Sequence, residues 1–146
     1  MKNILVLILL LSSLSVANER YIRDNTKEVV LDTKTNLLWQ DNAIVSDNSL
    51  TKTWSNALTY CENLNFSGFT DWKLPNYNEL YYLADRSKSS SSISEVFQNV
   101  ASAYHWTSTT SFSDNANAWA IFFSGGNDFS DIKTDTNYVR CVRVVN

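Results

Sequence analysis

The chain has 146 residues, of which 44% are hydrophobic and 13% are aromatic, which is enough apolar material for the core of one globular domain. Five Trp, seven Tyr and seven Phe against one Pro and three Gly argue against a disordered chain. The net charge of −3 gives no basis for binding nucleic acid or an anionic membrane.

The N-terminal segment is typical of a secretory signal peptide. Lys2 supplies a positive charge, Ile4 to Leu11 form an unbroken apolar run, and small residues suit cleavage after Ala17. The apolar run is too short to cross a membrane. We therefore predict that residues 1–17 are removed and that residues 18–146 form one domain without a membrane span. This domain is expected to be exported to the periplasm, the cell surface or the medium. An uncleaved anchor is the alternative.

Export changes how the two cysteines, Cys61 and Cys141, are interpreted. In an oxidising compartment two cysteines are most simply explained as a disulfide. A zinc site would need about four Cys or His ligands, whereas His105 is the single histidine. The sequence therefore predicts a disulfide, with no metal site and no cofactor. Free or reactive thiols are the alternative.

The first half of the domain is predicted to contain two strands and a helix. Residues 28–31 and 37–40 are strand-like and flank a polar turn. Residues 53–64 are predicted to form a helix with Thr53 as its N-cap. Apolar residues recur there at helical spacing and form one stripe: Trp54, Ala57, Leu58, Cys61 and Leu64.

A second helix is predicted to begin at Asn76. Asn76 and Glu79 have the spacing of a capping box, and Pro75 keeps the preceding residue extended. A carboxylate at the third helical position stabilises free backbone N–H groups, so a structural role for Glu79 is favoured over catalysis. The apolar face is expected to continue after it, through Leu80, Leu83 and Ala84.

The second half of the domain is rich in predicted strands. Strand character is present in residues 103–112 and 117–126, weak in 128–135 and strong in 138–145. Glycines at 125 and 126 suit a hairpin turn. The fold class is therefore predicted to be α+β, with strands, two helices and then a mainly antiparallel sheet of three or four strands.

Five motifs stand in order along the chain: DTKTNLLWQ, ALTYCENL, GFTDWKLPNYNELYYL, YHWTSTT with AWAIFF, and YVRCVR. In order and spacing they resemble the Lcl C-terminal domain family, which comprises the C-terminal domain of a bacterial collagen-like adhesin and many exported relatives. The resemblance covers about residues 28–143. Asn36 stands where the family usually has Gly, and Asn tolerates the left-handed conformation that such a turn requires.

The resemblance implies a C-type-lectin-like domain, with two helices packed on a mainly antiparallel, twisted sheet. In such domains a cysteine of the first helix pairs with a cysteine of the last strand. Cys61 and Cys141 occupy these two positions. The calcium signatures of sugar-binding C-type lectins are absent, and the connection over residues 111–117 is too short for their calcium loop. Calcium-dependent lectin activity is therefore not expected.

Several polar and aromatic residues allow a structural and a functional interpretation. Four aspartates are expected to form a solvated acidic face rather than a calcium site: Asp114, Asp128, Asp131 and Asp135. His105 is expected to be structural rather than a general base. Trp72 and Trp106 are expected in the core, although chain tryptophans such as Trp119 can also form a stacking platform for sugars. Arg140 and Arg143 are expected to pair with carboxylates at the sheet surface, with binding of an anionic ligand as the alternative.

The sequence therefore predicts an exported, non-enzymatic binding module that recognises a glycan or a protein, with no catalytic residues. Recognition is expected at the connection 111–117 and the turn 125–128. The candidate ligand-binding residues are Phe112, Asp114, Asn115, Asn117, Asn127 and Asp128. The competing hypothesis is a structural subunit of an envelope assembly, in which a partner covers Phe112, Phe122 or Phe129. An enzyme related to the formylglycine-generating type ranks third.

Overall fold

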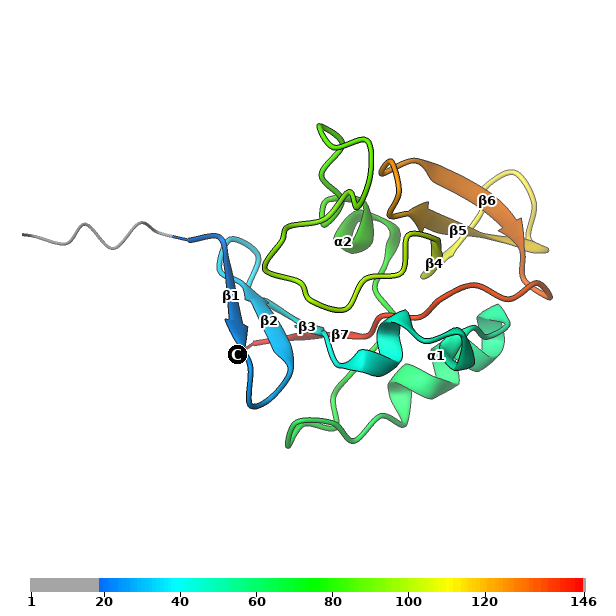
Figure 1. Ribbon diagram of the computed structural model, residues 1–146. Coiled ribbons are helices and arrows are strands. Elements are labelled where there is room, and N and C mark those ends of the chain that lie inside the picture. The colour runs from blue at the N-terminus through cyan, green and yellow to red at the C-terminus, as the bar shows by residue number, and fades with distance from the viewer. Residues whose placement is uncertain (1–18, 146) are drawn as a thin grey trace, which may run out of the picture.

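The protein is an α+β domain with two antiparallel sheets and two α-helices (Figure 1). The structure, a computed structural model, describes residues 19–145, so the predicted signal peptide over residues 1–17 lies outside the described part. The first sheet has the order β1-β2-β3-β7 and the second has the order β4-β5-β6. The strands of the described part therefore form two sheets, and the expectation of one sheet is wrong.

The first sheet is built from short strands, of which the two central ones are largely buried on both faces. Its strands are β1 (Tyr21–Asp24), β2 (Val29–Asp32), β3 (Leu37–Gln40) and β7 (Val142–Val144). Successive side chains of a strand point to opposite faces, and Val29 and Val30 accordingly pack into two different apolar clusters. Asn36, in the turn between β2 and β3, has a φ of 54°, which confirms its expected left-handed conformation.

The second sheet contains β4 (Tyr104–Thr110), β5 (Asn117–Phe122) and β6 (Asp128–Ile132). β5 is central and pairs with both neighbours in antiparallel register. The β4–β5 pairing is irregular between Trp106 and Thr110. Gly126 has a φ of 76° in the turn before β6, as the expected hairpin turn requires.

Two α-helices and two short 3-10 helices complete the described elements. The 3-10 helices η1 (Ala43–Ser46) and η2 (Asn48–Leu50) lead into α1 (Trp54–Glu62). Thr53 occupies the N-cap position of α1 but makes no side-chain cap hydrogen bond. α2 (Tyr77–Tyr81) is only five residues long. Its predicted capping box is confirmed, because Asn76 Oδ1 accepts from the Glu79 N–H and Glu79 Oε2 accepts from the Asn76 N–H.

The segment predicted as the last strand connects the two sheets instead of forming one long strand. Tyr138 forms a parallel bridge with His105 of β4, and only Val142–Val144 pair with β3. In Figure 1 this red segment runs from the second sheet to the first. Between these two pairings Arg140 turns inward and pairs with Asp41, which directly follows β3.

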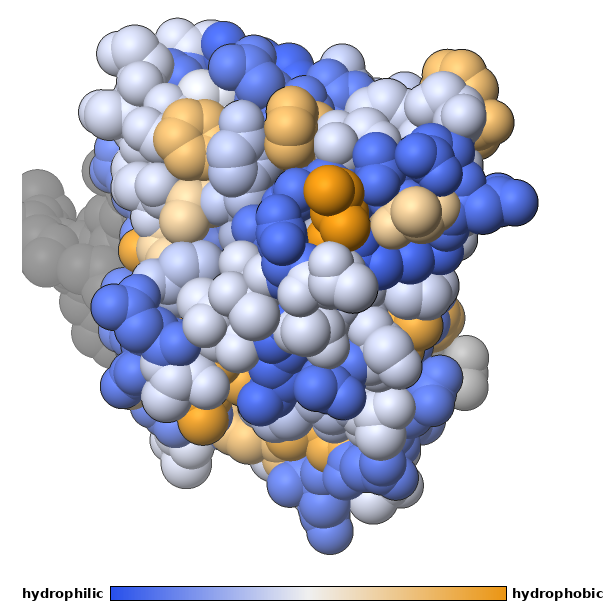
Figure 2. Space-filling model, turned by 90° about the vertical axis from the view of Figure 1, so that its right-hand side faces the viewer, coloured by the Kyte–Doolittle hydropathy of each residue, from blue (hydrophilic) through white to orange (hydrophobic). Residues whose placement is uncertain are grey.

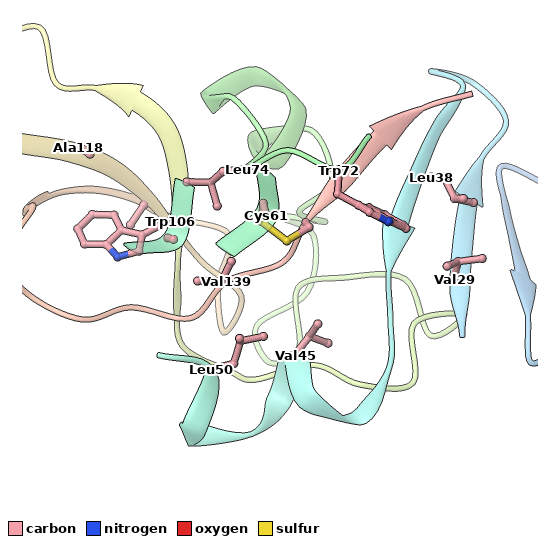
Figure 3. Close-up of a cluster of buried hydrophobic side chains, with 13 residues drawn as sticks. Val29, Leu38, Val45, Leu50, Cys61, Trp72, Leu74, Trp106, Ala118 and Val139 are labelled. Carbon is pink, nitrogen blue, oxygen red and sulfur yellow. A yellow bond between two sulfur atoms is a disulfide. The ribbon is translucent and has the colours of Figure 1, made fainter. Parts of the chain in front are cut away.

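A disulfide between Cys61 of α1 and Cys141 crosses this region, as predicted. Figure 3 shows the bond at the centre of an apolar cluster, with Trp106 on one side and Leu38 on the other. Trp72 and Trp106 are buried, which confirms their expected place in the core. The disulfide therefore joins the helix, the C-terminal segment and the larger core cluster.

Candidate functional site

The residues with the clearest capacity for ligand binding surround a surface hollow beside α2 and the second sheet. We call it the aromatic hollow, and its volume is about 450 Å³. It is lined by Asn76, Tyr77, Asn78, Thr109, Phe112, Trp119 and Asp128. The lining thus combines three aromatic rings with amide, hydroxyl and carboxylate groups, which is the usual chemistry of a small recognition site.

Tyr77 is the residue that joins the elements around the aromatic hollow. Its backbone N–H donates to Thr109 Oγ1 of β4 at 2.9 Å, and its hydroxyl donates to Asp128 Oδ2 of β6 at 2.8 Å. Burial, and then the hydrogen bond to Asp128, raise the pKa of Tyr77 to about 12. The hydroxyl therefore stays protonated at neutral pH and keeps donating to Asp128, so that the ring is held at both ends.

The aromatic rings form a continuous series across the site. The Tyr77 ring stacks on Tyr81 at a centroid distance of 5.2 Å and meets Trp119 edge to face at 5.6 Å. The ring of Phe112 lies 6.0 Å from that of Trp119. Phe112 is 91% exposed, whereas Trp119 is half-buried in the sheet. An exposed ring beside a rigid, partly buried pair provides ready apolar contact area for a ligand.

The structure brings two of the six predicted ligand-binding residues, Phe112 and Asp128, together in the aromatic hollow. The other four do not line it. Asp114 holds the β4–β5 turn by accepting from the Ala116 N–H, and the Asn115 carbonyl accepts from Lys133 Nζ. Asn117 pairs with β6, and the Asn127 carbonyl accepts from the Phe122 N–H.

Sequence reasoning did not include Tyr77 and Trp119 among the ligand-binding residues. Tyr77 follows the capping residue of a predicted helix, so its position indicated a structural role. One signal was available, because Tyr77 and Tyr81 are four residues apart and therefore share a helix face. Trp119 suits a stacking role by its residue type, but its partner rings come from distant parts of the chain.

A second hollow of similar size, about 420 Å³, lies on the first sheet. We call it the sheet hollow, and Leu31, Leu38 and Phe69 are among its apolar lining residues. Its two arginines are already engaged, because Arg23 pairs with Asp41 and Arg143 pairs with Asp71. The sheet hollow thus offers mainly apolar area, and its arginines are committed to carboxylates.

The buried ion pair of Arg140 and Asp41 is a structural feature that the sequence did not predict. Both side chains are fully buried, and Arg140 Nη1 lies 3.1 Å from Asp41 Oδ1. Asp41 also accepts from the backbone N–H groups of Gln98 and Asn99. Burial, and then the positive charge of Arg23, lower the pKa of Arg140 to about 9, so it remains charged at neutral pH. The expectation that Arg140 pairs at the sheet surface is therefore wrong.

The neighbouring arginine behaves as expected. Arg143 makes a bidentate pair with the exposed Asp71, with Nε–Oδ1 and Nη2–Oδ2 distances of 2.6 and 2.9 Å. Its guanidinium also lies 4.0 Å from the centre of the Phe69 ring. The carboxylate and the ring together occupy the cation, which leaves it little capacity for an anionic ligand.

His105 is fully buried within the sheet. Its Nδ1 lies 3.0 Å from the carbonyl oxygen of Ala103. A carbonyl only accepts, so Nδ1 carries the proton and donates, while Nε2 finds no partner among residues 19–145. Burial, and then the positive charge of Arg140, lower the pKa of His105 to about 3. This neutral, enclosed ring fits the expected structural role.

Acidification is expected to destabilise the domain through His105. The pKa of this group is about 3 in the folded protein and about 6.5 when unfolded, so the unfolded chain binds the additional proton between these values. The stabilisation is present above pH 6.5 and is lost as the pH falls towards 3, at up to about 1.4 kcal/mol per pH unit. Urea unfolding at several pH values should show a shallower dependence for His105→Gln than for wild type. Equal slopes would contradict the assignment.

Residues 19–145 contain neither a cluster of metal ligands nor a membrane-spanning helix. Between residues 19 and 145, no three His, Cys, Asp or Glu side chains gather closely enough to hold a metal ion. Asp131 accepts from Asn137 Nδ2 at 2.7 Å, and Asp128 accepts from Tyr77, so these two aspartates serve different contacts. In the same part of the chain, no helix has the length and apolar character needed to cross a membrane.

Fold and site together define a small, disulfide-linked α+β domain with an aromatic surface hollow. The chain belongs to the Lcl C-terminal domain family, whose family model matches residues 28–143. The match includes both cysteines and every residue that lines the aromatic hollow. Among curated proteins, none matches the chain.

Proposed function

We propose that the protein is an exported, non-enzymatic recognition module that binds its ligand in the aromatic hollow. Membership of a family defined on an adhesin-like domain supports a role in surface recognition. The disulfide fits an oxidising compartment, which supports export. The ligand would be an exposed group on a glycan or a protein.

The proposal rests on the aromatic rings and polar groups that meet in the aromatic hollow. Three rings from separate elements, those of Tyr77, Phe112 and Trp119, converge beside polar groups that are free to bind. No hydrogen bond within residues 19–145 engages the side-chain amide of Asn78. Rigid aromatic surface next to free amide and carboxylate groups allows stacking and hydrogen bonding to act together.

A C-type-lectin-like fold is part of the proposal. The disulfide between the first α-helix and the C-terminal segment, the two helices and the antiparallel sheets support it. The site would then lie at the β4–β5 connection, where a rigid sheet carries a short exposed loop.

The state of the reactive side chains supports a non-enzymatic role. Cys61 and Cys141 are consumed in the disulfide, so neither offers a thiolate nucleophile. His105 is enclosed and has a pKa of about 3, which is poorly matched to a general base at neutral pH.

Replacing Phe112 with Ala is expected to weaken recognition strongly without unfolding the domain. The side chain is 91% exposed, so truncation removes contact area for a ligand but little core packing. The measurement is binding of residues 18–146 to a glycan array and to immobilised cell-surface proteins, with and without calcium. We expect at least about a tenfold loss of binding, as for a central aromatic contact.

Phe129→Ala is the matched control. Phe129 is 48% exposed in the same sheet, but it pairs with Ala120 and packs near Tyr104, away from the aromatic hollow. Binding that survives Phe112→Ala but is lost in Phe129→Ala would contradict the proposed site.

The alternative function, a subunit of an envelope assembly, is favoured by one specific observation. Tyr104 contacts both Phe122 and Phe129, at centroid distances of 4.7 and 5.5 Å, and the three rings form a partly exposed group. Phe112 is not part of this group, since it packs on Trp119, whose side chain leaves β5 on the opposite face from Ala120. Figure 2 shows one face of the molecule, on which apolar groups are small and separated by polar ones.

A further inference from the structure

We propose that the group bound in the aromatic hollow is a cation of the ammonium type, either alkylated or protonated. This inference rests on the proposed function, because it names the chemistry of the ligand for the same site. Two kinds of ligand would present such a cation, namely a quaternary ammonium headgroup and a protonated amino sugar.

The aromatic rings that line the hollow are inclined to one another. The planes of Tyr77 and Trp119 make an angle of 66°, and those of Phe112 and Trp119 make an angle of 35°. The three rings that line the hollow are therefore inclined to one another and do not form one flat platform. Aromatic faces carry negative electrostatic potential, and several faces around one space favour a cation with apolar substituents.

The lining of the aromatic hollow carries a negative charge. Asp128 is the single charged residue among the seven that line the aromatic hollow, and neither Lys nor Arg is present in this lining. Tyr77 donates to Asp128 Oδ2, while Oδ1 accepts no hydrogen bond from the described residues. One carboxylate oxygen is thus free to face a ligand. A hollow with one carboxylate and three rings is electrostatically complementary to a cation and disfavours an anion.

The aromatic series already holds one cation at its other end. The Arg86 guanidinium lies 3.3 Å from the centre of the Tyr81 ring, and Tyr81 stacks on Tyr77. Arg86 also donates to the carbonyl oxygens of Tyr81 and Ala84, so it is tied to its own loop. At the other end of the series, the residues between 19 and 145 that line the hollow beside Phe112 and Trp119 include no Lys or Arg.

The test uses choline and its uncharged isostere, 3,3-dimethylbutan-1-ol, titrated into residues 18–146. Binding is followed through the indole N–H signal of Trp119 by NMR. We expect choline to bind at least about tenfold more tightly than the alcohol, because only choline gains the attraction of the rings and the carboxylate. A second pair, glucosamine and glucose, distinguishes a protonated amino sugar from an alkylated ammonium group as the source of the cation.

Variants connect the binding to the proposed contacts. Asp128→Asn keeps an oxygen that can accept from Tyr77 but removes the charge, and it should weaken choline binding about tenfold. Phe112→Leu keeps apolar area but removes a ring, and it should also weaken choline binding. Asp135→Asn is the matched control, since Asp135 is exposed and lies outside the lining of the aromatic hollow. The affinity of this variant for choline should equal that of wild type.

The possible outcomes separate this inference from the proposed function. Equal binding of choline and the alcohol, no binding of either cation, or unchanged choline binding by Asp128→Asn would overturn the cation assignment. A neutral ligand on the array that is lost in Phe112→Ala would overturn only the cation assignment and leave the proposed function in place. Array binding that does not respond to Phe112→Ala would overturn the proposed function itself.

Discussion

Removing the disulfide is expected to lower the free energy of unfolding by roughly 4–5 kcal/mol, from the loop-entropy effect of a cross-link that spans 80 residues. This is comparable to the whole stability of a modest domain. Both sulfurs lie in fully buried residues, so the cross-link also fixes α1 against the C-terminal segment within the core. A Cys61→Ala, Cys141→Ala double variant should therefore retain only a small part of the wild-type stability.

Urea unfolding of residues 18–146, with and without a reductant, measures this effect. The midpoint of the wild-type transition should fall on reduction, to a value near that of the double variant. The double variant is its own control, because the reductant should not change its midpoint. Coincident midpoints for oxidised wild type and the double variant would show that the cross-link contributes little.

Asp41→Ala is expected to destabilise the domain by about 3–5 kcal/mol, since it leaves the buried Arg140 without its carboxylate. Arg140 would keep only the carbonyl oxygens of Gln40 and Asn99 as acceptors. Asp41 also binds the backbone of Gln98 and Asn99, so the loop before β4 should loosen as well. Chemical denaturation gives the loss in stability, and hydrogen exchange shows whether this loop opens.

The control for this prediction is the more exposed ion pair of Arg143 with Asp71. Asp71→Ala removes the partner of Arg143, but the side chain of Asp71 is 55% exposed and solvent can replace the contact. We expect a much smaller loss of stability than for Asp41→Ala. Equal losses for the two variants would mean that burial does not determine the strength of the Arg140 pair.

Local features of the fold could be predicted from the sequence because their causes are local. The apolar stripe that includes Ala57 and Cys61 predicted α1, and both residues are fully buried. The capping box of Asn76 and Glu79 predicted the start of α2, and both hydrogen bonds are present. Such signals depend on residues three or four positions apart, which periodicity and capping rules describe well.

The division into two sheets could not be predicted because it depends on distant pairings. The strand character of residues 138–145 does not indicate which strand they join. In the structure Tyr138 pairs with β4, whereas Val142 pairs with β3, about 100 residues earlier in the chain. The burial of Arg140 was missed for the same reason, since its partner Asp41 follows β3.

The candidate site was only partly predicted, for a related reason. Exposed residues at or beside turns, such as Phe112 and Asp128, can be recognised in the sequence as aromatic and polar positions. Tyr77 is brought to them by the packing of α2 on the second sheet, through its contacts with Thr109 and Asp128. A site formed by three separate elements has no local sequence signature.

An NMR map of the binding surface tests most directly whether the ligand occupies the aromatic hollow. Residues 18–146 would be labelled with 15N and titrated with the glycan or peptide that wild type binds on the array. Binding in the aromatic hollow should concentrate the shift changes at Tyr77, Thr109, Phe112 and Asp128 and at the indole of Trp119. Changes confined to the sheet hollow, around Leu31, Leu38 and Phe69, with these signals unmoved, would contradict it.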